Sequence, residues 1–182
     1  MRCFWDLTKN LYQCVIIMKK TKFNIMINSE QSDYTEMATE VLAPLAQPPE
    51  ELDVQSEKVE FYTEGELTVT KDGKYCLSYD ESKLTGMDGS VTSVNFDMKN
   101  PELVTLMRSG NYRMAMVFES GKRHICTYQT PYMPIELCVV TKRLENTLTK
   151  DGGSLSVDYS IETNGMKCEI TRLRLTAQRC ER

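Results

Sequence analysis

The chain has 182 residues, of which 41% are hydrophobic and 26% are charged. This length is enough for one sizeable core and short for two, so we expect a single domain with appendages. A formal net charge of −4 leaves no general excess of Lys and Arg to neutralise phosphates, which argues against nucleic acid as a partner.

The cysteines and the N-terminus predict a cytoplasmic protein. The seven cysteines are odd in number and most fall within predicted strands, so we interpret them as reduced thiols. The apolar run at 14–17 is too short for a signal-peptide core or a membrane span, so we expect neither export nor a membrane partner. Residues 1–21 are expected to be an extension, and Met18 is a candidate natural start because the first strand is predicted just after Lys20.

From residue 57 to residue 177 the sequence alternates apolar and polar residues in short runs between turn signals, without a helical period. In chain order the alternation predicts strands over residues 22–28, 59–69, 75–79, 91–98, 103–108, 112–118, 124–128, 135–139, 155–161 and 166–177. Short connections between them favour an all-β, antiparallel up-and-down meander barrel of about eight to ten strands. The single domain is expected over 22–177, with a tail at 178–182.

Two strands carry signs of local distortion. Gly65 lies in the middle of a regular strand, which predicts a bend or a bulge. In the last strand the apolar parity slips between Ile170 and Leu173, which predicts one extra residue near Thr171 or Arg172.

Residues 30–56 differ in character from the strands around them. The segment is acidic and contains Pro44, Pro48 and Pro49, which would stop a possible short helix over 33–42. Two interpretations stay open: a mobile connection, or an ordered lid over one mouth of the barrel.

Several separate motifs resemble one family. They are Thr-Glu-Gly-Glu-Leu at 63–67, Tyr-Asp-Glu-Ser-Lys-Leu-Thr-Gly-Met-Asp-Gly at 79–89, Leu-Met-Arg-Ser-Gly at 106–110, Thr-Tyr-Gln-Thr-Pro-Tyr at 127–132 and Asp-Tyr at 158–159. In this order, over about 23–177, they resemble the YwiB-like family of small β-barrel proteins from low-GC Gram-positive bacteria (Firmicutes). The resemblance implies a cytoplasmic, lipocalin-like (calycin) barrel. That family has no established activity, so the resemblance assigns no catalytic or binding residues.

This chain departs from the family pattern at two places. Met133 stands where glycine is expected in the Thr-Pro-Tyr-Gly turn, and the connection over 30–56 is longer than usual. Because of the first departure, that turn need not have the geometry of the family. Because of the second, the barrel mouth need not be open.

Arg108 is the charged residue that the barrel pattern places inside. It shares its parity with Val104 and Leu106, so its guanidinium is expected to point inward. An unpaired buried charge is strongly unfavourable, and Glu81 or Glu64 is the expected partner.

Two roles are open for such a pair. It closes the barrel as a plug, or it holds the anionic group of a ligand between Arg108 and the hydroxyls of Tyr79 and Tyr128. The candidate ligand-binding residues are therefore Tyr79, Glu81, Arg108 and Tyr128. They suit a polar or anionic ligand better than a lipid.

Other candidate sites have simpler explanations. The single histidine, His124, shares a strand face with Cys126 but has no further ligand set, so no metal site is predicted. A charged outer face of the barrel explains Arg172 and Arg174 on the last strand at least as well as a ligand does. The methionines are interpreted as ordinary core residues.

No nucleophile motif, phosphate loop or metal spacing stands out, so we expect no enzyme and no cofactor. The sequence predicts a barrel that binds a small molecule at one end. The alternative is a ligand-free protein-interaction or structural module with a solid interior.

Overall fold

The computed structural model describes residues 17–33, 56–70, 73–80, 89–163 and 166–180. These residues form ten strands: β1 (Ile17–Asp33), β2 (Ser56–Thr70), β3 (Lys74–Asp80), β4 (Val91–Asp97), β5 (Asn100–Ser109), β6 (Met114–Glu119), β7 (Arg123–Gln129), β8 (Pro134–Asn146), β9 (Gly152–Thr163) and β10 (Met166–Arg179). Residues 34–42 of the predicted helix and residues 34–55 of the predicted connection lie outside the described residues, whereas residues 30–33 belong to β1 and Ser56 begins β2, so the predicted connection was too long at both ends. No helix among the described residues is long and apolar enough to cross a membrane.

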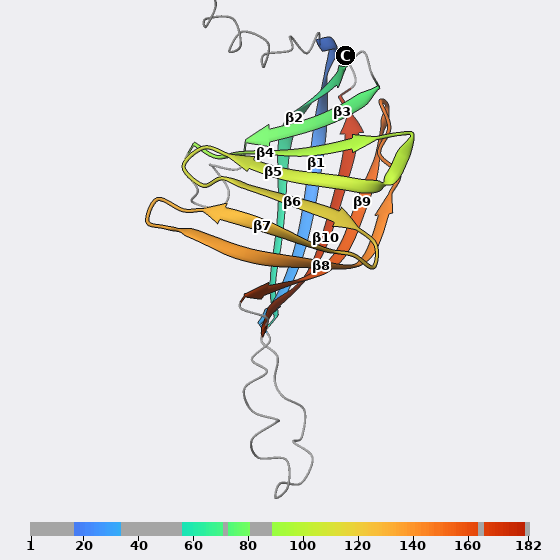
Figure 1. The fold of residues 1–182 in the computed structure, drawn as a ribbon. Helices are drawn as coiled ribbons and strands as arrows, with labels where there is room; N and C mark the ends of the chain where they lie inside the picture. The colour runs from blue at the N-terminus through green and yellow to red at the C-terminus, as the bar shows by residue number, and fades with distance from the viewer. Residues whose placement is uncertain (1–16, 34–55, 71–72, 81–88, 164–165, 181–182) are drawn as a thin grey trace, which may run out of the picture.

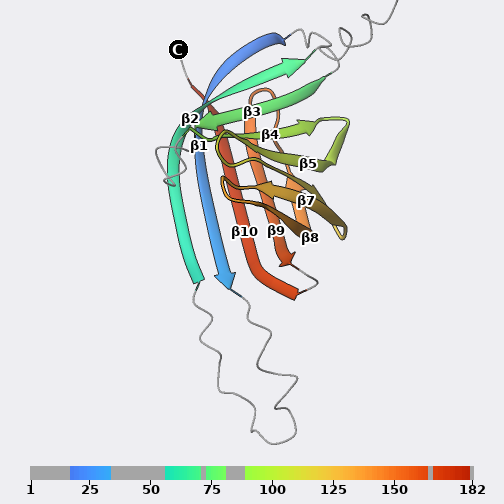
Figure 2. The same ribbon diagram turned by 60° about the vertical axis from the view of Figure 1, so that its left-hand side comes forward.

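The ten strands form one antiparallel sheet in the order β6-β5-β4-β3-β2-β1-β10-β9-β8-β7. Except for β6 and β7, which form the two edges, strands that are consecutive along the chain are neighbours in this order, and β1 pairs with β10 to join the two halves. In Figures 1 and 2 the sheet curls so that β3 to β7 run across the direction of β1, β2, β9 and β10. The predicted meander barrel is confirmed.

The barrel wall is incompletely hydrogen-bonded between β6 and β7. Backbone bonds join the two ends of this hairpin, from Lys122 N to Glu119 O (3.0 Å) and in both directions between Arg113 and Gln129 (3.1 and 2.8 Å). Over the intervening strand residues, all of which are described, no β6–β7 ladder is present. The barrel is therefore nearly closed.

Alternating residues of all ten strands meet in the core. Its most deeply buried large side chains are Phe23, Ile25, Leu77, Phe118, Leu155 and Leu175. Burial of such side chains stabilises the fold by roughly 1.5–3 kcal/mol each, and the inner face of every strand contributes to one continuous cluster.

Gly65 is required by close packing. A Cβ at this position would lie 2.3 Å from Ile25 Cδ1 and 2.7 Å from Ser78 O. The pairing of β2 shows no register shift there, so the strand has no bulge at Gly65. Pairing of β2 with β3 begins at Gly65, and β2 curves strongly in Figure 2, in agreement with the predicted bend.

The irregularity predicted for the last strand is present but lies earlier. The register of β10 against β9 shifts between Lys167 and Glu169, so the prediction of a bulge at Thr171 or Arg172 was wrong. Ile170 caused the error because it is apolar yet 37% exposed. From Glu169 onward, alternate residues of β10 point inward.

The structure extends several predicted strand ends. Because β1 starts at Ile17, Met18 and Lys20 lie within that strand. Because β10 ends at Arg179, and Cys180 N donates to Lys22 O at 3.1 Å, the predicted tail at 178 is partly strand.

The connection between the strands predicted over 91–98 and 103–108 is a tight turn at Met98 and Lys99. Lys99 N donates to Asp97 Oδ1 at 2.8 Å, and β5 already begins at Asn100.

Candidate functional site

The meander places alternate connections at the same end of the barrel. The β3–β4, β5–β6 and β7–β8 connections share one end, here called the Arg108 end, where the strands that they join lie side by side (Figure 1). The β8–β9 turn lies at the opposite end together with the end of β10, here called the Arg179 end. Each end offers candidate site residues.

Arg108 lies on a cross-strand row of the inner face, here called the Arg108 row. Tyr79 of β3 lies opposite Thr92 of β4, Thr92 lies opposite Arg108 of β5, and Arg108 lies opposite Met114 of β6. Tyr79 and Thr92 are buried and Met114 packs against the core, so Arg108 points inward. With a strand spacing of about 4.8 Å, the Cα atoms of Tyr79 and Arg108 are about 10 Å apart. Both side chains have interaction partners in the structure.

Tyr128 extends the Arg108 row onto β7. The bridge between Arg113 and Gln129 places Tyr128 opposite Met114, and the Tyr128 ring stacks on Tyr112 with centroids 6.2 Å apart. The register therefore brings Tyr79, Arg108 and Tyr128 to the same end of the barrel.

Two carboxylates, Glu81 and Glu64, were expected to pair with Arg108, and the structure describes only Glu64. Glu81 lies outside the described residues. Glu64 is exposed and lies three residues before the buried Leu67, so the two side chains point to opposite faces of β2. It lies on the outer face of β2, so the expectation that Glu64 pairs with Arg108 was wrong.

A second buried polar group, the Tyr159 cluster, consists of Thr141, Tyr159, Thr171 and Glu169. Thr141 of β8 and Thr171 of β10 lie directly opposite Tyr159 of β9, one on each side. The Tyr159 hydroxyl hydrogen-bonds with Thr171, whose Oγ1 donates to Glu169 Oε1. The Tyr159 ring also packs on Phe118 of β6, with centroids 5.0 Å apart.

The Tyr159 hydroxyl responds to charges from two walls of the barrel. Burial is the main cause that raises the pKa of Tyr159 to about 12. The hydrogen bond with Thr171 lowers it, the carboxylate of Glu169 raises it further, and the guanidinium of Arg108 lowers it. Burial is therefore the main influence on the pKa of this phenol.

Some buried hydroxyls have unused hydrogen-bonding capacity. Thr141 Oγ1 and Ser90 Oγ are buried without a hydrogen-bond partner in the part of the chain that the structure describes. Thr141 is only 1% exposed. An unpaired buried hydroxyl is unfavourable, so Thr141 is a point at which a bound molecule would gain a hydrogen bond.

The arginines of the last strand lie on the outer face. Arg174 Nη1 is 2.9 Å from Asp158 Oδ1, and Arg172 Nη1 is 3.5 Å from Glu30 Oε2. Both side chains are substantially exposed, so the explanation by surface charge is confirmed.

The remaining candidates lack the features of a catalytic or metal site. Burial raises the pKa of the Cys126 thiol, whereas a nucleophilic cysteine needs a lowered one. His124 Nε2 lies 3.5 Å from Glu119 Oε2, and no group of three potential metal ligands occurs among the described residues. Cys76, Cys126, Cys138 and Cys180 are free thiols.

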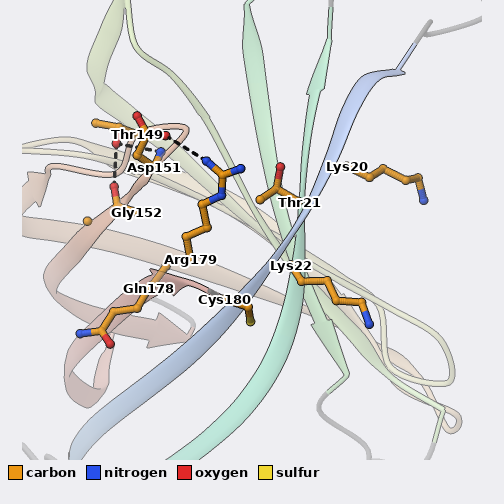
Figure 3. Close-up of a pocket in the computed structure, with 11 residues that line it drawn as sticks. Lys20, Thr21, Lys22, Thr149, Asp151, Gly152, Gln178, Arg179 and Cys180 are labelled. Atoms are coloured by element: carbon orange, nitrogen blue, oxygen red, sulfur yellow. Dashed lines mark hydrogen bonds and ion pairs between the residues drawn. The ribbon is translucent and has the colours of Figure 1, made fainter. Parts of the chain in front are cut away.

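A cavity of about 1270 Å³ lies at the Arg179 end, between β1, the β8–β9 turn and the end of β10 (Figure 3). Arg179 extends to the turn, where its Nη1 is 3.5 Å from Asp151 Oδ1. Lys20 and Lys22 point to the other side of β1 from Thr21 (Figure 3), and Lys20 Nζ is 2.7 Å from Glu66 Oε1. The cations of this cavity diverge, so it lacks a common point for an anion.

The fold and its inner polar groups define a ten-stranded meander barrel with charged and hydroxyl groups on the inner face of one end. Residues 49–175 match the family described as a domain of unknown function, DUF1934, and the chain belongs to this family. It is 28% identical over 124 residues to the uncharacterized β-barrel protein YwiB of Bacillus subtilis (strain 168), a match covering 68% of this chain and 83% of that protein.

The crystal structure of the ywiB protein from Bacillus subtilis has a similar fold. The TM-score is 0.67 at 22% sequence identity, and the match covers 91% of this chain and 96% of that chain. The predicted family resemblance is confirmed. The narrower lipocalin-like grouping stays a prediction.

Proposed function

We propose that this barrel binds a small polar or anionic molecule at the Arg108 end, without catalysing a reaction. The observation that carries the proposal is the position of Arg108 on the inner face, in one cross-strand row with Tyr79 and Thr92. Arg108 already has an interaction partner in the structure, and the planar donors of a guanidinium also suit a carboxylate or phosphate.

The surroundings of Arg108 support a binding site. Tyr79 and Tyr128 lie on the same inner row, and phenols donate hydrogen bonds to anionic oxygens. Glu81 is kept as a candidate residue from the sequence. The free thiols of Cys76, Cys126, Cys138 and Cys180, in the part of the chain that the structure describes, accord with a cytoplasmic location.

The test compares Arg108→Met with Arg174→Met, which removes an arginine from the outer face. Both variants and the wild type are heated with a panel of small carboxylates and phosphates. A ligand at one hundred times its Kd stabilises the wild type by about 2.7 kcal/mol, a rise in Tm of roughly 5–10 °C. We expect this rise in the wild type and in Arg174→Met but not in Arg108→Met. A wild type that no anion stabilises, or an equal rise in Arg108→Met, contradicts the proposal.

A second candidate function rests on exposed apolar residues near β7. Ile125 is 72% exposed, and Tyr132 and Met133 in the β7–β8 turn are 93% and 63% exposed. Large apolar side chains that are exposed on β7 and in the turn that follows it favour a protein-interaction module. In that case Ile125→Lys would remove a co-purifying protein, and Arg108→Met would leave it bound.

A further inference from the structure

We propose that the outer face of β10, β1 and β2 carries a second binding site, which takes a neutral sugar in its pyranose form. The site is a groove of about 590 Å³. Its outward side chains, here called the outer groove, are Asn24, Met26, Tyr62, Glu64, Thr176 and Gln178. They lie on the opposite face of the sheet from Arg108, so this inference goes beyond the proposed function and is independent of it.

Strand pairing assembles the outer groove as two adjacent rows. β1 lies between β10 and β2 (Figures 1 and 2), so its residues form the floor and those of its neighbours form the walls. Asn24 and Met26 of β1 alternate with the buried Ile25, so both point outward. The polar row consists of Gln178, Asn24 and Glu64, and the mixed row consists of Thr176, Met26 and Tyr62.

The polar row combines hydrogen-bond donors with an acceptor. Among the described residues, the side chains of Glu64 and Gln178 make no hydrogen bond or ion pair. Asn24 Oδ1 accepts a hydrogen bond from Cys180 Sγ at 3.5 Å, which leaves both N–H donors of this amide for a ligand. A ligand of this row has to accept from the amides and donate to the carboxylate. A hydroxyl group does both.

The mixed row offers an apolar surface beside the polar one. The side chain of Tyr62 is 68% exposed, and its hydroxyl donates to Glu60 Oε1 at 2.8 Å, which holds the ring on the outer face. The half-buried Met26 next to it adds a polarizable thioether. The C–H groups on one face of a pyranose ring pack on the electron-rich face of an aromatic ring. The hydroxyls at the edge of the sugar then reach the polar row.

Other classes of small ligand fit the outer groove less well. Glu64 is the only charged member of the six, so an anion meets a like charge and finds no cation. A hard metal ion such as Ca²⁺ takes about six to eight oxygen ligands, far more than one carboxylate supplies. An organic ammonium would pair with Glu64, but it has no acceptor for the amide donors of Asn24 and Gln178. A neutral polyhydroxylated ring satisfies both kinds of group.

The experiment titrates the full-length, ¹⁵N-labelled protein with the methyl β-pyranosides of glucose, galactose, mannose and N-acetylglucosamine. NMR follows the side-chain amide signals of Asn24 and Gln178. Butylammonium and butyrate serve as a cationic and an anionic probe of similar size.

Each substitution in the outer groove has a matched control outside it. Tyr62→Leu is compared with Tyr132→Leu, because the Tyr132 side chain is 93% exposed in the β7–β8 turn. Glu64→Gln is compared with Glu136→Gln, which removes an exposed carboxylate from β8. All four side chains are exposed, so the folded state tolerates these changes.

We expect at least one glycoside to shift both amide signals in the wild type and in the two control variants. Tyr62→Leu should weaken its binding about fivefold to tenfold, because leucine is apolar but has no aromatic face. Glu64→Gln should also weaken it, because an amide oxygen is a poorer acceptor than a carboxylate. Since the ligand is neutral, its affinity should be the same at low and at high salt.

Three results overturn the inference. If none of the glycosides shifts the two amide signals in the wild type, the outer groove does not bind sugars. If butylammonium binds more tightly than every glycoside and loses its affinity in Glu64→Gln, the groove is a cation site. If Tyr62→Leu binds the glycoside as tightly as the wild type does, the ring of Tyr62 does not contact the sugar. None of these results bears on the Arg108 end, which has its own test.

Discussion

Two buried threonines flank Tyr159 and use their hydroxyls differently. Thr171 Oγ1 donates to Glu169 and hydrogen-bonds with Tyr159, whereas Thr141 Oγ1 has no partner among the described residues. Both side chains are 1% exposed, so replacement by valine conserves their shape and their burial. The two substitutions form a matched pair.

We expect Thr141→Val to raise the free energy of unfolding by about 1 kcal/mol, because it removes an unpaired buried hydroxyl. Thr171→Val should lower it by about 1–3 kcal/mol, because it leaves other buried groups unpaired. Urea denaturation measures both. An equal loss in the two variants would show that Thr141 is hydrogen-bonded in solution.

The titration of Tyr159 makes the free energy of unfolding depend on pH in the alkaline range. Its pKa is about 12 in the folded protein, against an ordinary value of 10.0. Below pH 10 both the folded and the unfolded state keep the proton, so the contribution of Tyr159 to the free energy of unfolding is fully present. Between pH 10 and 12 the unfolded state loses its proton first, and the contribution of about 2–3 kcal/mol is lost.

Tyr159→Phe lacks this titration. The difference in free energy of unfolding between wild type and Tyr159→Phe should therefore shrink as the pH rises from 9.5 to 12. Denaturation at both pH values measures it. A difference that is the same at both ends of this range would mean that the phenol is not shielded from water.

At the level of elements, β6 and β7 should show an alternating pattern of amide exchange. The mutual bonds between Arg113 and Gln129 direct the backbone groups of odd-numbered residues on β6 and β7 toward each other. Because no ladder joins these strands, the amides of Ala115, Val117 and Ile125 should exchange quickly. The amides of Met116 and Phe118 face β5 and should be protected.

Hydrogen exchange followed by NMR resolves these amides individually. The alternation within one strand is its own control, since neighbouring residues share the same solvent and the same local fold. Equal protection of odd and even residues would show a complete ladder between β6 and β7 in solution.

The strands were largely predictable from sequence because alternation and turn dipeptides are local signals. Asp72-Gly73 marks the β2–β3 hairpin, and the alternation around Leu155 gives β9 within a few residues. The errors came where local signals conflict with tertiary packing. Ile170 is apolar but faces outward, so the irregularity of β10 was placed too late.

At the level of the whole molecule, the site was predictable only in part. The parity of Arg108 with Val104 and Leu106 gave its inward direction correctly. Its place in one row with Tyr79 and Tyr128 depends on how separate strands pair, which no local pattern reveals. The inward direction of Glu169 was missed because β10 pairs regularly from Glu169 onward, where the sequence predicted a bulge.

The central claim is that the barrel holds a small molecule through Arg108. Native mass spectrometry of the protein purified from its own host, as wild type and as Arg108→Met, tests it most directly. The account predicts a bound species of small mass on the wild type that is lost from Arg108→Met. A wild type that is empty, or a species retained equally by both proteins, would contradict it.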